Sequence, residues 1–151
     1  IAAKAVSFKQ ALDPSFAEYQ AQVVKNAQAM ASQFILPGFK VLTGGSDNHL
    51  NLVDLRNKNL TGKLAEKVLD DIGITANKNA VPFDTESPFV TSGLRFGTPA
   101  VTTRGFKEAE CRTVVDIINT MLTDVHNPSV AQQAQAMVRE LCDAHPLYQT
   151  L

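Results

Sequence analysis

The chain of 151 residues is 44% hydrophobic and 19% charged, and its formal net charge is -1. These ordinary values give no basic footprint for nucleic acid and no polybasic patch for a membrane surface. No run approaches the roughly 20 apolar residues of a membrane span, and the first residues lack the layout of a secretory signal. We expect one cytoplasmic domain, long enough to bury roughly 68–70% of its unfolded surface.

The first two predicted elements are helices. Residues 1–12 are compatible with the end of a helix, so we expect the chain to begin inside an element. Asp13-Pro14 then combines a capping residue with a proline at the first helical position, which indicates a new helix. Apolar residues recur there at spacings of three and four over about twenty residues. Pro37-Gly38 is expected to end that helix.

Two short strands and a third helix are predicted next. Residues 39–42 and 50–55 read as strands, and the turn-forming cluster 43–48 between them is typical of a hairpin. Thr61 is well placed to cap the third helix, and Gly73 is expected to end it.

The second half of the chain completes the predicted sheet and its cover. Residues 74–81 are expected to be extended, a loop follows, and 94–102 is predicted to be the last strand. Two further helices, 103–125 and 129–144, have apolar stripes wide enough to pack on a sheet. The predicted fold class is α+β in two layers, with a small antiparallel or mixed sheet of three or four strands covered on one face by helices.

Arg95 is the sharpest chemical feature of the sequence. In Leu94-Arg95-Phe96 the two apolar neighbours favour one face of a strand, so Arg95 is expected to point to the other face. A guanidinium is a rigid fork of donors that matches a carboxylate bidentately. The alternative, and by spacing alone the commoner case, is an arginine on a solvated strand face.

Other tempting motifs favour structural roles. Thr61-Gly62-Lys63 is similar to the end of a phosphate-binding loop, but Asn57 stands where that loop needs its first glycine, which favours a helix start. The three histidines lie far apart with no pair at metal-ligand spacing, so no metal site is expected. His49 is expected to be hydrogen-bonded within the hairpin, with a place in an active site as the alternative.

Neither the cysteines nor the acidic residues of the hairpin indicate catalysis. Cys111 and Cys142 both fall in helical patterns, where we expect buried thiols in a reducing compartment. Neither lies in a loop or at a helix start, where the pKa of a thiol would fall. Asp47 and Asp54 have no partner acid at a readable spacing, so no general acid/base pair is named.

Several blocks occur in the order and spacing of a known family. They are Gly44–His49, Asp54-Leu55, Asn59–Lys63, Asn77–Asn79, Ser87–Arg95 and Gly97–Ala100. In these blocks the chain resembles the C-terminal part of serine hydroxymethyltransferases. The resemblance implies that residues 1–151 form the small C-terminal domain of an aspartate-aminotransferase-like (fold type I) pyridoxal enzyme. Residues 1–12 would then end a helix that leads from a large domain.

The resemblance also implies a function. Such enzymes interconvert serine and glycine, use pyridoxal 5'-phosphate as an electron sink, and pass the one-carbon unit to tetrahydrofolate as homodimers. Arg95 matches the arginine that holds the substrate carboxylate. Asn79 matches the asparagine that contacts folate, although a turn residue that satisfies its own backbone is the alternative. Ser87, Pro88 and Phe89 match the segment that borders the same ligand.

One family feature is missing from these residues. The cofactor of the family is bound to a lysine in a Thr-Thr-His-Lys context, and no Thr-His-Lys occurs in the 151 residues. We therefore expect no catalytic residue in this chain, with the cofactor bound mainly by a large domain. Two alternatives stay open: a stand-alone, non-catalytic folate-binding or interaction module, and another pyridoxal enzyme such as an aminotransferase, which has no folate for Asn79 to contact.

Overall fold

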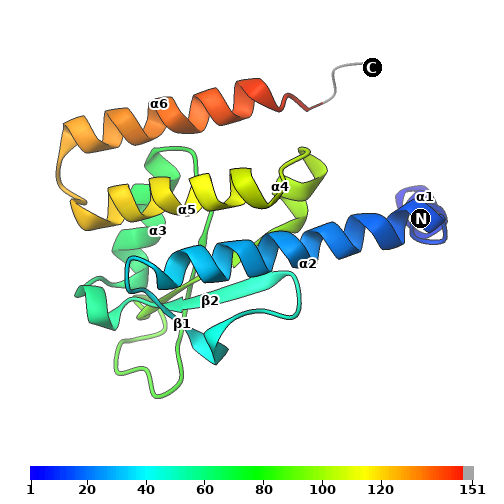
Figure 1. The fold of residues 1–151 in the computed structure, drawn as a ribbon. Coiled ribbons are helices and arrows are strands. Elements are labelled where there is room, and N and C mark those ends of the chain that lie inside the picture. The colour runs from blue at the N-terminus through cyan, green and yellow to red at the C-terminus, as the bar shows by residue number, and fades with distance from the viewer. Residues whose placement is uncertain (148–151) are drawn as a thin grey trace.

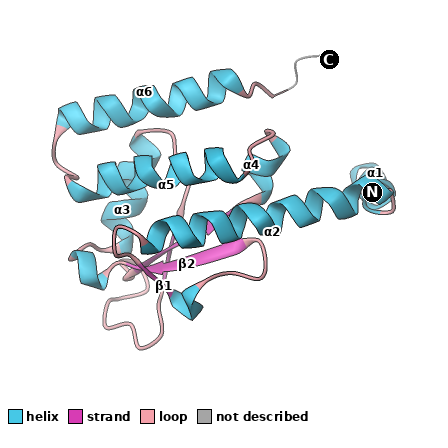
Figure 2. Cartoon of the chain, viewed as in Figure 1, coloured by secondary structure: helices cyan, strands magenta, loops and turns pink. Residues whose placement is uncertain are grey.

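The computed structural model describes residues 1–147 and has a four-stranded antiparallel sheet with helices on one face (Figures 1 and 2). The strand order is β1-β2-β4-β3, so the last two strands are exchanged relative to their order in the chain. This confirms the predicted α+β class, and it gives the sheet four strands that all pair in the antiparallel sense.

The first two helices, α1 (Ala2–Ala11) and α2 (Pro14–Ile35), confirm the predicted boundaries. The Asp13 carboxylate accepts a hydrogen bond from the N–H of Ser15 at 2.9 Å, which caps α2. Gly38 then takes a left-handed φ of 85°, a conformation that ends a helix and that glycine adopts without steric cost. Helix α2 buries its predicted apolar stripe, whereas α1 buries no residue and lies beyond the end of α2, away from the sheet (Figure 1).

The sheet consists of β1 (Lys40–Val41), β2 (Leu50–Asp54), β3 (Asn77–Asn79) and β4 (Gly93–Gly97). A buried row runs across it, because Val41 pairs with Val53 and Val53 pairs with Leu94. These side chains face the helices. The predicted hairpin is therefore confirmed, although its first strand is shorter than expected.

Helix α3 (Gly62–Asp71) begins and ends where the sequence predicts. The hydroxyl oxygen of Thr61 accepts from the N–H of Leu64 at 3.3 Å, and Gly73 after the helix has a φ of 87°. Helix α3 also holds strand β3, since Glu66 accepts from the backbone N–H of Lys78 at 2.9 Å and from its ammonium group at 2.7 Å.

The last predicted strand, 94–102, is too long. Strand β4 ends at Gly97, and Pro99–Thr103 forms a short helix, α4. The chain turns because Thr98 is fully buried, and its hydroxyl group donates to the carbonyl oxygen of Val23 in α2 at 2.8 Å. Pro99 then occupies the first turn of α4, where its missing N–H costs nothing.

The helix predicted over 103–125 begins later than expected. Gly105 has a φ of 97° and separates α4 from α5, which spans Glu108–Thr123. Glu110 accepts from the backbone N–H of Lys107 at 2.9 Å and so helps to start α5. Buried Asn26 of α2 fastens this junction, because its amide nitrogen donates to the carbonyl oxygen of Phe106 at 2.9 Å.

The last helix, α6 (Pro128–Ala144), has the predicted position, and Asn127 caps it by accepting from the N–H of Ser129 at 3.0 Å. It lies over α5 on the side away from the sheet (Figure 1). Helices α2, α3 and α5 meet the buried face of the sheet in one core that includes Phe34, Val53, Leu69, Leu94 and Ile118. None of the described α-helices covers the opposite face of the sheet (Figure 1), which is open for a site.

Candidate functional site

The open face of the sheet carries Arg95. Its neighbours Leu94 and Phe96 are buried against the helices, whereas Arg95 is exposed on the opposite side of β4, as the alternation predicts. Across the sheet Arg95 pairs with Leu52 of β2 and with Asn77 of β3. The guanidinium therefore stands between its two neighbouring strands.

A hollow of about 780 Å³ lies over this face. Its walls are the strand side chains of Leu50, Leu52 and Arg95, together with Asn79 and Pro82. The hairpin connection, residues 42–48, forms the remaining wall. A long loop separates Asn79 from Arg95 in the chain, yet the antiparallel pairing of β3 with β4 puts both residues on one hollow.

The guanidinium of Arg95 is available for a ligand. Among residues 1–147 it takes part in none of the hydrogen bonds or ion pairs, although ion pairs hold Arg56 and Lys78. An arginine fork that is free of protein acceptors can bind a carboxylate through two parallel hydrogen bonds. The arrangement is suited to orienting a small carboxylic acid on the sheet.

Asn79 makes one local hydrogen bond and also lines the hollow. Its amide nitrogen donates to the carbonyl oxygen of Ala80 at 2.7 Å, which is the local backbone contact expected of a turn residue. Its amide oxygen makes no hydrogen bond within the described part of the chain, and the side chain still lines the hollow. Asn79 can therefore offer an acceptor to a ligand that lies beside Arg95.

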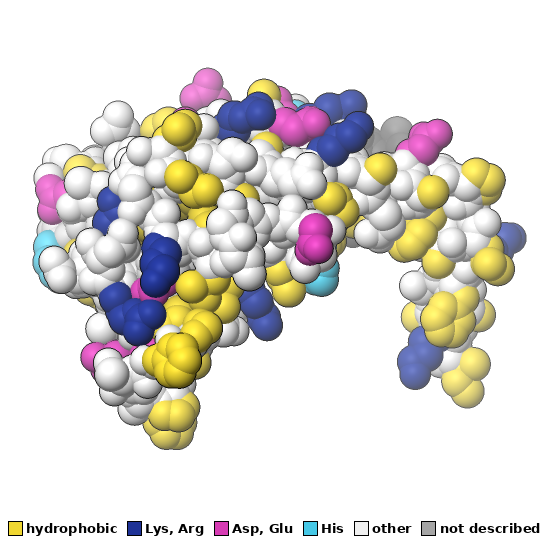
Figure 3. Space-filling model, turned by 60° about the horizontal axis from the view of Figure 1, so that its bottom comes forward, with side chains coloured by type: hydrophobic (Ala, Val, Ile, Leu, Met, Phe, Trp, Pro, Cys, Tyr) yellow, Lys and Arg dark blue, Asp and Glu magenta, His cyan; other side chains and the backbone are white. Residues whose placement is uncertain are grey.

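Ser87, Pro88 and Phe89 do not line this hollow. All three are exposed, and the Phe89 side chain has 81% of its surface accessible. The carbonyl oxygen of Ser87 accepts from the N–H groups of Val90 and Thr91, both at 2.9 Å, so the segment is a tight turn. Figure 3 faces this end of the molecule and shows hydrophobic side chains projecting beside Lys and Arg side chains.

Asp84 organises the loop between β3 and β4 and was not among the residues that the sequence singled out. One carboxylate oxygen accepts from the N–H groups of Val81 (3.1 Å) and Ser92 (2.9 Å). The other accepts from the N–H of Glu86 (3.0 Å) and the hydroxyl of Ser92 (2.7 Å). Desolvation alone would raise the pKa of Asp84, but these hydrogen bonds outweigh it and lower the pKa to about 2. The available signal was Asp two residues before Glu86, the pattern of an Asx turn.

The loop is also fastened to the start of α3. The N–H groups of Gly62 and Lys63 donate to the carbonyl oxygens of Thr91 and Val90, both at 2.9 Å. Gly62 permits this approach, since a Cβ atom there would lie 2.6 Å from the carbonyl oxygen of Gly93. These amides bind the loop instead of a phosphate, which confirms the reading of Thr61-Gly62-Lys63 as a helix start.

Asp54 has a structural role beside the site. Its side chain is almost fully buried, and Arg56 donates to it from two nitrogens, the shorter distance being 2.7 Å. Hydrogen bonding to Arg56 is the main reason that the pKa of Asp54 lies below its usual value. Asp47 lies in the hairpin connection that lines the hollow.

His49 and the two cysteines do not line the hollow. The carbonyl oxygen of His49 accepts from the N–H of Thr98 at 3.1 Å, while no hydrogen bond from its ring is found in residues 1–147. Cys111 is buried in α5, and burial raises the pKa of its thiol to about 12. Cys142 is half-buried in α6. Within the described residues no three His, Cys, Asp or Glu side chains are grouped for a metal ion, and none of the helices is long and apolar enough to cross a membrane.

The family model described as serine hydroxymethyltransferase matches residues 1–118. The match includes all four strands, the loop held by Asp84, and both Arg95 and Asn79.

Proposed function

Because the chain belongs to the serine hydroxymethyltransferase family, we propose that it is the C-terminal domain of a pyridoxal-phosphate-dependent enzyme of this family. That enzyme interconverts serine and glycine and transfers the one-carbon unit to tetrahydrofolate. The observation that carries the proposal is the free Arg95 guanidinium in the hollow that it shares with Asn79. The family match favours this enzyme over an aminotransferase.

The residues of the hollow do not fit pyridoxal phosphate by themselves. The cofactor needs a lysine and a phosphate-binding group, and in the described part of the chain no lysine lines the hollow. The first amides of α3 are occupied by the loop, as described above. We therefore place the cofactor-binding lysine in another domain. Helix α1 supports such a domain, because its ten residues bury nothing in this one.

Arg95 has the role of binding the α-carboxylate of serine or glycine. Two parallel hydrogen bonds from a guanidinium fix both the position and the plane of a carboxylate. Orienting the amino acid in this way decides which bond at its α carbon is aligned for reaction, an effect that is entropic in origin. Arg95 itself moves no proton.

Asn79 and the segment Ser87, Pro88 and Phe89 have the role of binding tetrahydrofolate. The free amide oxygen of Asn79 can accept from an N–H of the folate ring system. Phe89 offers an exposed aromatic face outside the hollow, which suits stacking on a ring. The Asp84 hydrogen bonds keep this segment in one conformation, so little entropy is lost when ligand binds.

Replacing Arg95 by alanine in the full-length protein that contains this chain tests the proposal. The lost bidentate pair comprises two charge-assisted hydrogen bonds of about 1.5–3 kcal/mol each, so kcat/KM for serine should fall by about 10²–10⁴-fold. Arg95→Lys keeps the charge without the fork and should give an intermediate loss. Arg139→Ala, on the exposed side of α6, is the matched control and should leave turnover unchanged.

A kcat/KM for Arg95→Ala within threefold of the unsubstituted protein would exclude Arg95 from substrate binding. Asn79→Ala tests the folate role separately. Loss of one neutral hydrogen bond of about 1 kcal/mol should raise KM for tetrahydrofolate roughly fivefold and leave KM for serine unchanged. If the full-length protein binds reduced folate but does not turn over serine, it is instead a non-catalytic folate-binding module.

The family resemblance also leads us to propose a homodimer in the cytoplasm. The free thiols of Cys111 and Cys142 support a reducing compartment. Light scattering of the full-length protein in solution measures the oligomeric state, and a monomeric mass would contradict this proposal.

A further inference from the structure

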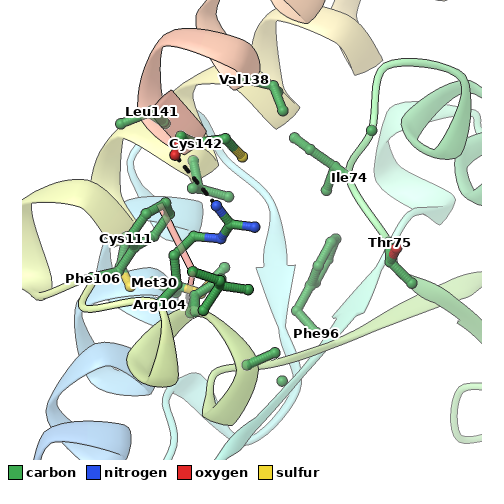
Figure 4. Close-up of a pocket in the computed structure, with 16 residues that line it drawn as sticks. Met30, Ile74, Thr75, Phe96, Arg104, Phe106, Cys111, Val138, Leu141 and Cys142 are labelled. Carbon is green, nitrogen blue, oxygen red and sulfur yellow. Dashed lines mark hydrogen bonds between the residues drawn. The ribbon is translucent and has the colours of Figure 1, made fainter. Parts of the chain in front are cut away.

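A second cavity lies on the other side of the sheet from Arg95, among the helices. Its volume is about 330 Å³, within the range of small-molecule sites. Phe96 of β4, Ile74, and side chains of α5 and α6 form its walls, which are mostly apolar (Figure 4). The cavity is partly open to the surface, so a small molecule from solution can enter it.

One cationic side chain enters this apolar space. Arg104 follows α4, and in Figure 4 its guanidinium lies among Cys142, Ile74 and Phe96. Its Nη1 donates to the carbonyl oxygens of Cys142 (3.3 Å) and His145 (3.1 Å) at the end of α6. The negative end of the helix dipole also favours a cation there. The guanidinium is thus held in place from one side.

The other side of the guanidinium is unused. In residues 1–147 its Nε and Nη2 make no hydrogen bond, and none of the ion pairs includes Arg104. The described residues that line the cavity include no Asp or Glu. The Nε–Nη2 edge of arginine is a bidentate donor of the right shape for a carboxylate. Among the described residues this half-buried cation has no anion beside it, so the charge of the cavity is complementary to that of an acid.

We propose that the cavity lined by Arg104, Ile74, Phe96 and Val138 binds a small amphipathic monocarboxylic acid, with its carboxylate on Arg104 and its apolar part against the other three. The volume fits an acid of about ten non-hydrogen atoms, since each water in the liquid occupies about 30 Å³. Aliphatic and aromatic acids share this chemistry. Octanoate and 3-phenylpropanoate are therefore the two probes, and 1-octanol is the uncharged control.

Cys142 provides a readout of occupancy. Its thiol lines the cavity and is half-buried, whereas Cys111 is buried and the pKa of its thiol is raised to about 12. Iodoacetamide reacts with thiolates, so it should modify Cys142 and leave Cys111 unmodified in the folded protein. An acid in the cavity covers Cys142 and should slow that modification.

The experiment combines calorimetry with peptide mapping of the full-length protein. We expect one of the two acids to bind at least about tenfold more tightly than 1-octanol, and to slow alkylation of Cys142 by about fivefold or more at saturation. Arg104→Met should remove the preference for acid over alcohol. Arg139→Met, on the exposed side of helix α6, should keep it.

Arg104 also holds the end of α6, so Arg104→Met is paired with a variant that leaves the arginine intact. Val138→Phe fills the cavity and should abolish acid binding while Arg104 keeps its two carbonyl contacts. Equal binding of the acids and 1-octanol, acid binding that survives Val138→Phe, or no effect of either acid on Cys142 alkylation would each overturn the proposal. None of these outcomes depends on the role of Arg95.

Discussion

Replacing Asp84 by alanine should loosen the loop at the open face and destabilise the whole domain. The carboxylate is the common acceptor for three backbone N–H groups and the hydroxyl of Ser92. Alanine removes all four acceptor contacts at once. The loop would keep its attachment to α3 but lose the group that fixes its interior.

The magnitude follows from which donors lose their partner. Val81 and Ser92 are only 5% and 3% exposed, so water cannot replace the carboxylate at their N–H groups. Glu86 is exposed, so water can replace it there. Each buried, unsatisfied donor costs about 1–3 kcal/mol, so the two buried N–H groups give a loss of about 2–6 kcal/mol for Asp84→Ala. Asp84→Asn retains one oxygen and should lose about half as much.

Urea denaturation measures the change in the free energy of unfolding, and amide hydrogen exchange at Ser92 reports the loop directly. Exchange at Ser92 should accelerate in Asp84→Ala. Asp47→Ala, in the exposed hairpin connection, is the matched control and should stay within 0.5 kcal/mol of the unsubstituted protein, about the usual limit for surface changes. A loss below 0.5 kcal/mol together with unchanged exchange at Ser92 would refute the role given to Asp84.

Three further predictions concern stability. The pKa of Asp84 falls from 3.8 to about 2 on folding, so the contribution of its carboxylate to stability is complete above about pH 4 and is lost as the pH falls through about 2. In denaturation experiments the stability difference between the unsubstituted protein and Asp84→Asn should vanish over that range. A difference that stays constant with pH would contradict this prediction. Gly62→Ala should destabilise the protein by about 1–3 kcal/mol, because the new Cβ would meet the carbonyl oxygen of Gly93, although alanine is the better helix former. Gly45→Ala is the control, since a Cβ there meets nothing within 4 Å. Equal melting temperatures for the two variants would disprove the clash. Asn26→Ala should cost about 1–3 kcal/mol by leaving the carbonyl oxygen of Phe106 without its buried donor, whereas exposed Gln28→Ala on the same helix should be neutral in the same thermal assay.

At the Arg95 site the local sequence determined which face of the sheet the side chain lies on, and strand pairing determined its neighbours. The alternation of Leu94, Arg95 and Phe96 was enough to place the guanidinium on the face opposite the core, since successive side chains of a strand point to opposite sides. The partner strands were not readable, because pairing joins residues that are distant in the chain. The exchanged order of β3 and β4 brings Asn79 to the same hollow and leaves Ser87, Pro88 and Phe89 outside it.

The sequence alone determined the features that depend on local chemistry. Four such features involve groups that lie within a few residues of one another, so their patterns predict the elements. They are the caps at Asp13 and Thr61, the left-handed glycine Gly38 and the apolar stripe of α2. The end of the last strand needed the tertiary structure. Thr98 stops β4 by donating to Val23, 75 residues away, and no local pattern encodes that partner. The edge of Arg104 that makes no hydrogen bond within residues 1–147 was likewise decided by the packing of α6, since a cavity exists only where elements distant in sequence meet.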